Sequence, residues 1–221
     1  MAKQVSPLNP LALYNLVSAL LWGYLLYNVL VVYPKVGQPQ FFEEWKDSVT
    51  FIQCGAIIEV LNSILGIVRA PVVTTAAQVA SRLLVVIGIF QYLPESANCH
   101  NVVFLTLLLA WTSTEVVRYL FYFFNLSLAS GAPKFVVLLR YNLFWVLYPL
   151  GVASELLIIY SALPYAEEKY SIYFKWALIG SMFTYIPGFP VLFMHMVGQR
   201  KKVMRSLSSA NNTTSTTKKT N

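Results

Sequence analysis

Six long apolar stretches constrain this chain more than any other feature of its sequence. They cover approximately residues 11–33, 49–68, 75–93, 101–124, 134–163 and 170–198. Each reaches the roughly 20 residues that a helix needs to cross a bilayer, and each is too long and too evenly apolar for a barrel strand. The sequence therefore predicts an all-α, polytopic membrane protein: a bundle of six transmembrane helices over residues 1–205 and a disordered cytosolic tail over residues 206–221.

The composition agrees with a membrane location. Hydrophobic residues make up 57% of the chain and charged residues only 11%, which is too little charge to cover a soluble globule. A soluble enzyme and an intrinsically disordered protein are therefore excluded. The 2 cysteines are too few for a disulfide scaffold or a cysteine-rich zinc module. No second histidine or cysteine stands at metal-ligand spacing, so we expect no metal.

The lysines and arginines outside the spans predict the orientation, because these residues accumulate on the cytosolic side. Nine fall on one side and three on the other: Lys3, Arg69, Lys134, Arg200, Lys201, Lys202, Arg205, Lys218 and Lys219 against Lys35, Lys46 and Lys169. We therefore expect both termini in the cytosol. The net charge of +7 comes mostly from basic residues on the predicted cytosolic side of the membrane, so nucleic acid is not an expected partner. The two lysines near the carboxy terminus resemble an endoplasmic reticulum retrieval signal, the alternative being a solvated tail.

Charged side chains inside the spans need a physical reason, because each costs about 2.5–3.5 kcal/mol at a helix centre. The cost is tolerable where the group faces the bundle interior or meets an opposite charge. Glu115 and Arg118 are three residues apart and are expected to pair. A role limited to joining helices is the alternative for such groups. The charged residues within the spans are Glu59, Arg82, Glu115, Arg118, Arg140, Glu155 and Lys175.

The fifth span carries a phenol and a carboxyl on one helical face. Tyr148 and Glu155 are seven residues apart, which places them about 20° from eclipsed and roughly 10 Å apart along the axis. Pro149 removes a backbone hydrogen bond and is expected to kink the helix, and Gly151 permits a close approach to the backbone. Such a pair suits proton exchange with a substrate held between the two groups. A polar pair that only packs helices is the alternative.

The same span resembles a known family. The segment LRYNLFWVLYPLGVASE (139–155) is similar to the very-long-chain (3R)-3-hydroxyacyl-CoA dehydratases, also labelled protein-tyrosine-phosphatase-like, and the likeness extends through segments such as 13–27, 53–71, 110–124 and 185–202. The chain looks most like the fungal members. The resemblance places the family's catalytic pair on Tyr148 and Glu155. It gives supporting or substrate-binding roles to Glu59, Gln78, Arg82, Glu115, Arg118, Arg140 and Gly151.

The resemblance also implies an activity and its setting. The family removes water from a (3R)-3-hydroxyacyl-CoA to leave a trans-2-enoyl-CoA, the third step of fatty-acid elongation in the endoplasmic reticulum membrane, which feeds very-long-chain fatty acid and sphingolipid synthesis. This lyase reaction needs no cofactor and no metal. The implied partners are membrane lipid and the other elongation enzymes, namely the condensing enzyme, the ketoacyl reductase and the enoyl reductase.

The roles within the pair stay open at this point. The preferred assignment makes Glu155 the base and Tyr148 the acid, and the reverse is equally compatible with the sequence. Arg82 or Arg118 would steady charge on the thioester oxygen, and Arg140, about 12 Å along the helix from Tyr148, would receive the phosphates of CoA.

Two other classes of function are alternatives. A proton-coupled transporter would show broken helices related by internal symmetry, which the sequence lacks. A non-catalytic assembly protein of the elongation complex would be expected to have lost Tyr148 or Glu155. A cysteine phosphatase is excluded, because Val60 and Leu105, not arginines, stand six residues after Cys54 and Cys99.

Overall fold

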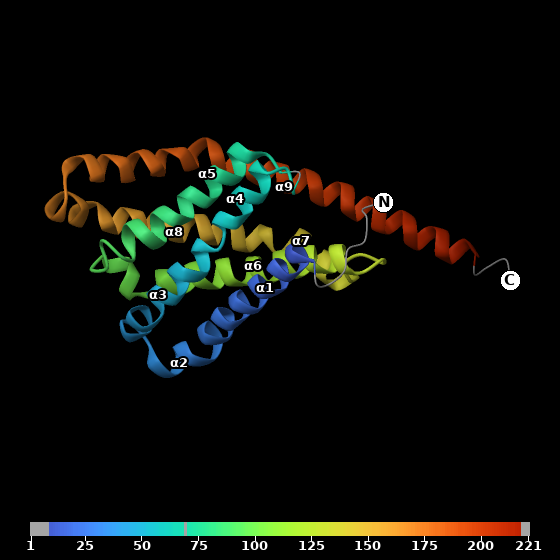
Figure 1. Ribbon diagram of the computed structural model, residues 1–221, viewed down its shortest axis with the longest axis horizontal. Helices are drawn as coiled ribbons and strands as arrows, with labels where there is room; N and C mark the ends of the chain where they lie inside the picture. Colours follow the sequence, from blue (N-terminus) through green and yellow to red (C-terminus); the bar gives the residue numbers. More distant parts are fainter. Residues whose placement is uncertain (1–8, 69, 218–221) are drawn as a thin grey trace.

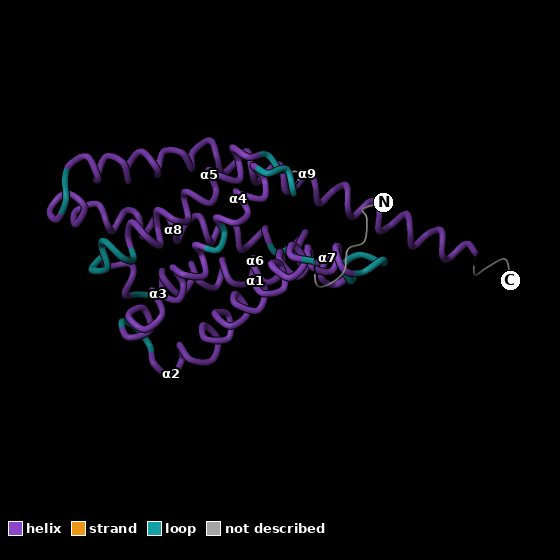
Figure 2. The backbone as a smooth tube through the Cα atoms, viewed as in Figure 1, coloured by secondary structure: helices purple, strands orange, loops and turns teal. Residues whose placement is uncertain are grey.

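Helices joined by short turns and loops make up the part of the chain that the computed structural model describes, residues 9–68 and 70–217 (Figures 1 and 2). Two π-helical stretches, Asn28–Val32 and Leu84–Ile89, and one 3₁₀ turn, Ala97–His100, interrupt or join the α-helices. Lys3, Arg69, Lys218 and Lys219 lie outside the described residues. The α-helices are α1 (Pro10–Tyr27), α2 (Tyr33–Val36), α3 (Gln40–Cys54), α4 (Ile57–Ile64), α5 (Val72–Leu83), α6 (Val102–Ser127), α7 (Lys134–Asn142), α8 (Phe144–Lys169) and α9 (Ile172–Thr217).

Five helical segments of the described chain are long and apolar enough to cross a membrane, which confirms an all-α, polytopic membrane protein. They are Pro10–Val36, Val72–Ile89, Val102–Ser127, Phe144–Lys169 and Ile172–Ser208. The expectation of six uninterrupted spans is wrong at residues 49–68, because α3 ends at Cys54 and α4 begins at Ile57.

Gly55 explains this interruption. The N–H of Gly55 donates to the carbonyl of Ile52 at 3.1 Å and the N–H of Ala56 donates to that of Gln53 at 3.0 Å, so each bond reaches back three residues instead of four. A Cβ at position 55 would lie 3.0 Å from the Ile52 carbonyl oxygen, which is tighter than nine in ten real Cβ contacts. The tightened turn keeps these backbone groups bonded, as a membrane interior requires.

The fifth and sixth expected spans also differ from the structure. The stretch 134–163 is divided at Leu143 into α7 and α8, and α8 continues through Pro149 without ending there. α9 runs on past Ser206 to Thr217, in a segment without glycine or proline after Gly198. The division of the chain at residue 205 stays a prediction.

The helices form a bundle built around α6. α1 packs along α6, α6 packs against α8, and α8 packs against α9, while α4 and α5 form a hairpin. Figure 1 shows the start of α1 and the α4–α5 and α6–α7 turns at one end of the bundle. The α2–α3 and α8–α9 turns lie at the other end.

One buried face of α6 fixes the position of the polar residues that follow. Phe104 makes edge-to-face contacts with Phe42 and Phe90, at centroid distances of 5.0 and 5.4 Å. Trp111 and Glu115 continue the same buried face toward the other end of the helix. The same face of α6 therefore packs in the hydrophobic core at one end of the helix and holds polar groups near the middle of the helix.

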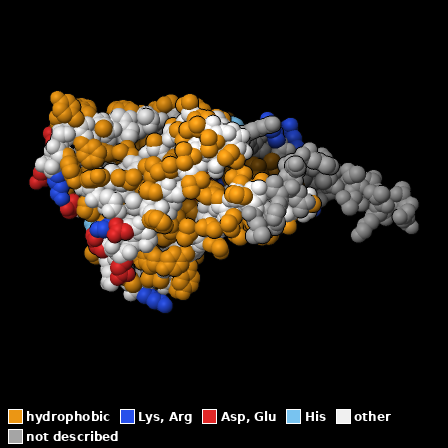
Figure 3. All heavy atoms as spheres, viewed as in Figure 1, with side chains coloured by type: hydrophobic (Ala, Val, Ile, Leu, Met, Phe, Trp, Pro, Cys, Tyr) orange, Lys and Arg blue, Asp and Glu red, His pale blue; other side chains and the backbone are white. Residues whose placement is uncertain are grey.

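The outer surface is apolar over the middle of the bundle, and the charged side chains that are visible lie toward its two ends (Figure 3). Large side chains such as Leu20, Phe51, Val73 and Tyr173 are exposed. An ion pair between Lys169 and Glu95 joins two segments at the end that holds the α8–α9 turn. This distribution matches a helix bundle whose middle faces lipid.

Candidate active site

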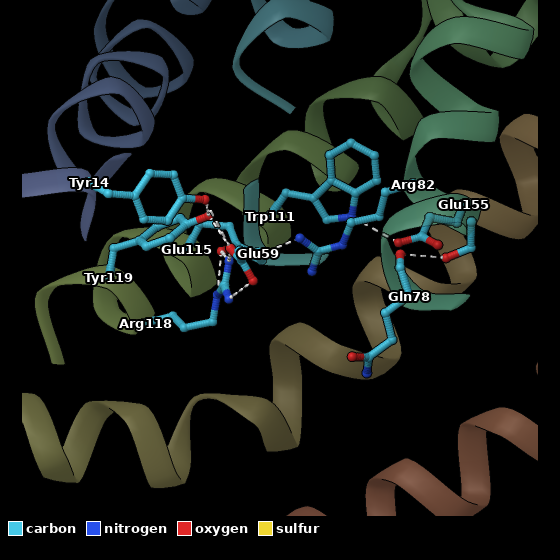
Figure 4. Close-up of polar contacts among 10 residues, drawn as sticks. Tyr14, Glu59, Gln78, Arg82, Trp111, Glu115, Arg118, Tyr119 and Glu155 are labelled. Carbon is cyan, nitrogen blue, oxygen red and sulfur yellow. Dashed lines mark hydrogen bonds and ion pairs between the residues drawn. The ribbon is translucent and has the colours of Figure 1, made fainter. Parts of the chain in front are cut away.

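Glu155 lies inside the bundle and is held by two donors. It is on α8 and is only 7% exposed. The indole N–H of Trp111, on α6, donates to its Oε1 at 2.8 Å (Figure 4). The hydroxyl of Tyr185, on α9, donates to its Oε2 at 2.6 Å. Three helices therefore converge on one carboxyl group.

Tyr148 lies two turns before Glu155 on α8, as the seven-residue spacing requires. Its ring is half-buried and stacks on Phe189 of α9, with centroids 5.2 Å apart and an interplanar angle of 3°. Glu155 and Arg82 are the charged groups that act electrostatically on its hydroxyl. Among the residues that the structure describes, this hydroxyl has no hydrogen-bond partner, so it is available to a ligand.

A second set of polar groups forms what we call the ion-pair cluster, made of Glu59, Arg82, Glu115 and Arg118 (Figure 4). Arg118 binds Glu59 through two hydrogen bonds of 2.6 and 2.7 Å and donates its Nε to Glu115 at 2.6 Å. Arg82 pairs with the other oxygen of Glu115. The expected pairing of Glu115 with Arg118 is confirmed, and the cluster ties α4 and α5 to α6.

Aromatic side chains surround the ion-pair cluster and connect it to Glu155. The hydroxyls of Tyr119 and Tyr14 both donate to Glu59 Oε1, the latter at 3.5 Å. The Arg82 guanidinium lies 5.6 Å from the ring centroid of Trp111, a cation–π contact. Because Trp111 also donates to Glu155, one indole joins the cluster to the carboxyl on α8.

Two of the expected site residues, Gln78 and Arg140, lie apart from this arrangement. Gln78 is one turn before Arg82 on α5, and its amide points away from the ion-pair cluster (Figure 4). Arg140 lies in the last turn of α7, where it donates to the hydroxyl of Tyr122 on α6 at 3.0 Å and stacks on the Tyr122 ring.

Gly151 serves helix packing. A Cβ at this position would lie 3.5 Å from the Cβ of Ala110 on α6. The close approach that we expected at this glycine is therefore made by a neighbouring helix.

Four residues of the arrangement were missed by sequence reasoning, namely Tyr14, Trp111, Tyr119 and Tyr185. Trp111 carried a usable signal, because it lies four residues before Glu115 and so shares its face of α6. The tyrosines carried none, since the chain contains 14 of them without a distinguishing pattern.

Two cavities are found elsewhere on the protein. One, of about 540 Å³, lies between α8 and α9 near Tyr160, Pro164 and Lys175. The other, of about 830 Å³, is an apolar groove along α7 and the start of α8 that includes Leu139 and Val146. Neither cavity is lined by Tyr148 or Glu155.

Comparison with known proteins decides the family. The model of the protein tyrosine phosphatase-like protein family, PTPLA, matches residues 53–206. The chain belongs to this family. A Caenorhabditis elegans relative, the very-long-chain (3R)-3-hydroxyacyl-CoA dehydratase hpo-8, is 41% identical over 207 residues, which are 88% of this chain and 94% of the relative.

Further PTPLA relatives come from plants and fungi. The rice very-long-chain (3R)-3-hydroxyacyl-CoA dehydratase PASTICCINO 2A is 35% identical over 90% of this chain and 95% of its own length. The probable dehydratase of Schizosaccharomyces pombe is 36% identical over 88% of this chain and 92% of its own length. The expectation that the chain looks most like fungal members is wrong, because the nematode protein is more similar than the fission-yeast protein. No solved structure matches the chain.

The cysteines of this PTPLA member do not support phosphatase chemistry. Cys99 lies in the 3₁₀ turn outside the spans, where burial raises the pKa of its thiol to about 12. Reactive cysteines instead have thiols that ionise near or below neutral pH. Cys99 is therefore a packing residue.

Proposed function

We propose that this protein dehydrates very-long-chain (3R)-3-hydroxyacyl-CoA to trans-2-enoyl-CoA, the third step of fatty-acid elongation. The observation that carries the proposal is the 41% identity to a dehydratase over 88% of the chain. The arrangement of Tyr148 and Glu155 supports it, because elimination of water needs one group to accept a proton and one to donate a proton.

The reaction balances with two proton transfers. Glu155 removes a proton from C2 of the acyl chain, and the electron pair of that C–H bond becomes the second bond between C2 and C3. The C3–O bond breaks, and the Tyr148 hydroxyl gives its proton to the departing oxygen, which leaves as water. A proton then returns from Glu155 to Tyr148 through solvent, which restores both groups for the next substrate.

Arg82 is the cation nearest to this chemistry. Its guanidinium pairs with Glu115 and lies over Trp111, whose N–H holds Glu155. The negative charge that develops on the thioester oxygen during C2 deprotonation would be stabilised by a fixed cation in an apolar site. We therefore assign Arg82 this role.

We further propose that α3 and α4 together make a sixth crossing. Residues 40–64 span about 37 Å if wound as a helix, more than the roughly 30 Å of a hydrocarbon core. With this crossing, both termini lie on one side of the membrane. The excess of lysine and arginine on that side favours the cytosol.

The same orientation suggests where CoA binds. Arg140, in the last turn of α7, contacts Tyr122 near the end of α6. The α6–α7 turn lies at the end of the bundle that would face the cytosol (Figure 1), so the charge of Arg140 would be available to the CoA phosphates. Family membership favours the endoplasmic reticulum membrane. In that membrane the condensing enzyme, the ketoacyl reductase and the enoyl reductase of the elongation cycle would be partners.

The decisive experiment measures product formation by the purified protein. A long-chain (3R)-3-hydroxyacyl-CoA is added in detergent, and the 2-enoyl-CoA is quantified by mass spectrometry. Tyr148→Phe and Glu155→Gln should each lose at least 10²-fold in kcat, the usual contribution of an acid or base group. Tyr173→Phe, on the exposed face of α9, is the matched control and should keep wild-type activity.

The outcomes separate the candidate functions. An inactive but folded wild-type protein would favour a non-catalytic assembly role. Full activity in both Tyr148→Phe and Glu155→Gln would contradict the proposed site while keeping the proposed reaction.

A further inference from the structure

We infer that Tyr185 and Trp111 are positioning residues that hold Glu155 as an ionised carboxylate and so make it the base of the catalytic pair. This inference rests on the proposed function. It goes beyond it by adding two residues, one from α6 and one from α9, and by giving a physical reason for the role of Glu155 as the base.

The hydrogen bonds on Glu155 show which form of the carboxyl group the site accommodates. An indole N–H can only donate, so Oε1 of Glu155 must be an acceptor. The Tyr185 hydroxyl lies 2.6 Å from Oε2, within the short range typical of an O–H donor on a charged oxygen. Both oxygens therefore accept hydrogen bonds, which favours the carboxylate.

The charges nearby do not provide Glu155 with a cation of its own. Arg118 is engaged by Glu59 and Glu115, and Arg82 is engaged by Glu115. The ion-pair cluster thus contains two positive and two negative groups and is balanced without Glu155. A buried carboxylate without a dedicated cation depends on its hydrogen-bond donors, and these are the two neutral side chains of Trp111 and Tyr185.

The remaining lone pairs of Glu155 are left for the substrate. An ionised carboxylate has about four acceptor positions, and the structure shows two of them occupied. Trp111 and Tyr185 come from different helices, so their bonds fix the carboxylate plane as well as its charge. Tyr148, whose hydroxyl contacts no donor or acceptor in the described chain, keeps its proton and is the acid.

The test compares two conservative variants that each remove one donor. Tyr185→Phe and Trp111→Phe keep a ring in place, and the latter keeps an aromatic face under Arg82. A hydrogen bond to a charged group contributes about 10- to 100-fold, so each variant should lose that factor in kcat. KM should stay within about twofold, because each substitution removes a hydrogen bond to Glu155 and keeps an aromatic ring in place. Tyr173→Phe is again the matched control.

Infrared spectra provide a readout that a merely structural role would not change. In the wild-type protein, the band that disappears in Glu155→Gln should be that of a carboxylate. In the Tyr185→Phe/Trp111→Phe double variant, a protonated carboxyl band should replace it. A protonated band in the wild type would overturn the inference, and so would wild-type kcat in both single variants.

Failure of this inference is distinguishable from failure of the proposed function. If the wild type is active, Glu155→Gln is inactive and Tyr185→Phe matches the wild type, only the positioning role is wrong. If the folded wild type forms no enoyl product, the proposed function is wrong, and with it the role of Glu155 as a base.

Discussion

Glu115 at the centre of the ion-pair cluster is the residue whose replacement should destabilise the fold most clearly. Its carboxylate is 1% exposed and is shared by Arg82 and Arg118. Glu115→Gln preserves the volume but removes the charge. Arg118 keeps Glu59, whereas Arg82 loses its ion-pair partner. Breaking a buried ion pair costs about 3–5 kcal/mol. Because only Arg82 loses its partner, we expect Glu115→Gln to lower the free energy of unfolding by the lower end of this range, about 3 kcal/mol.

This cost corresponds to a measurable change in melting temperature. For chains of this size, 1 kcal/mol shifts Tm by roughly 2–4 °C, so Glu115→Gln should lower Tm by roughly 6–12 °C. Thermal unfolding in detergent, followed by circular dichroism, measures the shift. Glu95→Gln is the control, because the Glu95–Lys169 pair is exposed and such pairs contribute little.

A double variant identifies the cause. Glu115→Gln combined with Arg82→Gln removes the unpaired charge along with its former partner, so part of the lost Tm should return. The reasoning is refuted if Glu115→Gln melts like Glu95→Gln, or if the double variant shows simple addition of two losses.

Two further predictions concern packing and thiol reactivity. Gly151→Ala should keep the wild-type Tm, because its Cβ would make an ordinary contact with Ala110 at 3.5 Å. Gly151→Leu should separate α6 from α8 and lower the free energy of unfolding by about 1–3 kcal/mol. Equal Tm values for the two variants would contradict the close packing. Cys99, with the pKa of its thiol raised to about 12, should be on the order of 10⁻⁴ thiolate at pH 8. In a Cys54→Ser background, maleimide labelling should therefore be slow until the protein is unfolded, and rapid labelling of the folded protein would show that the thiol is not buried.

The sequence predicted those parts of the fold that depend on composition and on neighbours along one helix. The all-α membrane architecture follows from long apolar stretches. The Glu115–Arg118 contact follows from helical spacing. Both features are local, so a single chain without structural information suffices to find them.

The remaining features depend on contacts between distant segments. Trp111 and Tyr185 reach Glu155 across 44 and 30 residues of sequence, and no spacing rule links such positions. The break at Gly55 was missed for a different reason. Its neighbours are as apolar as any span, so hydropathy shows no interruption, and only the backbone hydrogen bonds of the folded chain reveal it.

The tightened turn at Gly55 also sets the rotation of α4 about its own axis. Four backbone N–H groups here, those of residues 55, 56, 58 and 59, bond to a carbonyl three residues earlier. A 3₁₀ step advances about 120° per residue and an α step about 100°, so four such steps rotate everything downstream by roughly 80°. The N–H of Glu59 makes the last of these bonds, and its carboxylate pairs with Arg118. In a continuous helix the same glutamate would point to another side, and Arg118 would lose one of its two carboxylates. Gly55, which has no side chain of its own, thus determines on which side of α4 the Glu59 carboxylate enters the bundle.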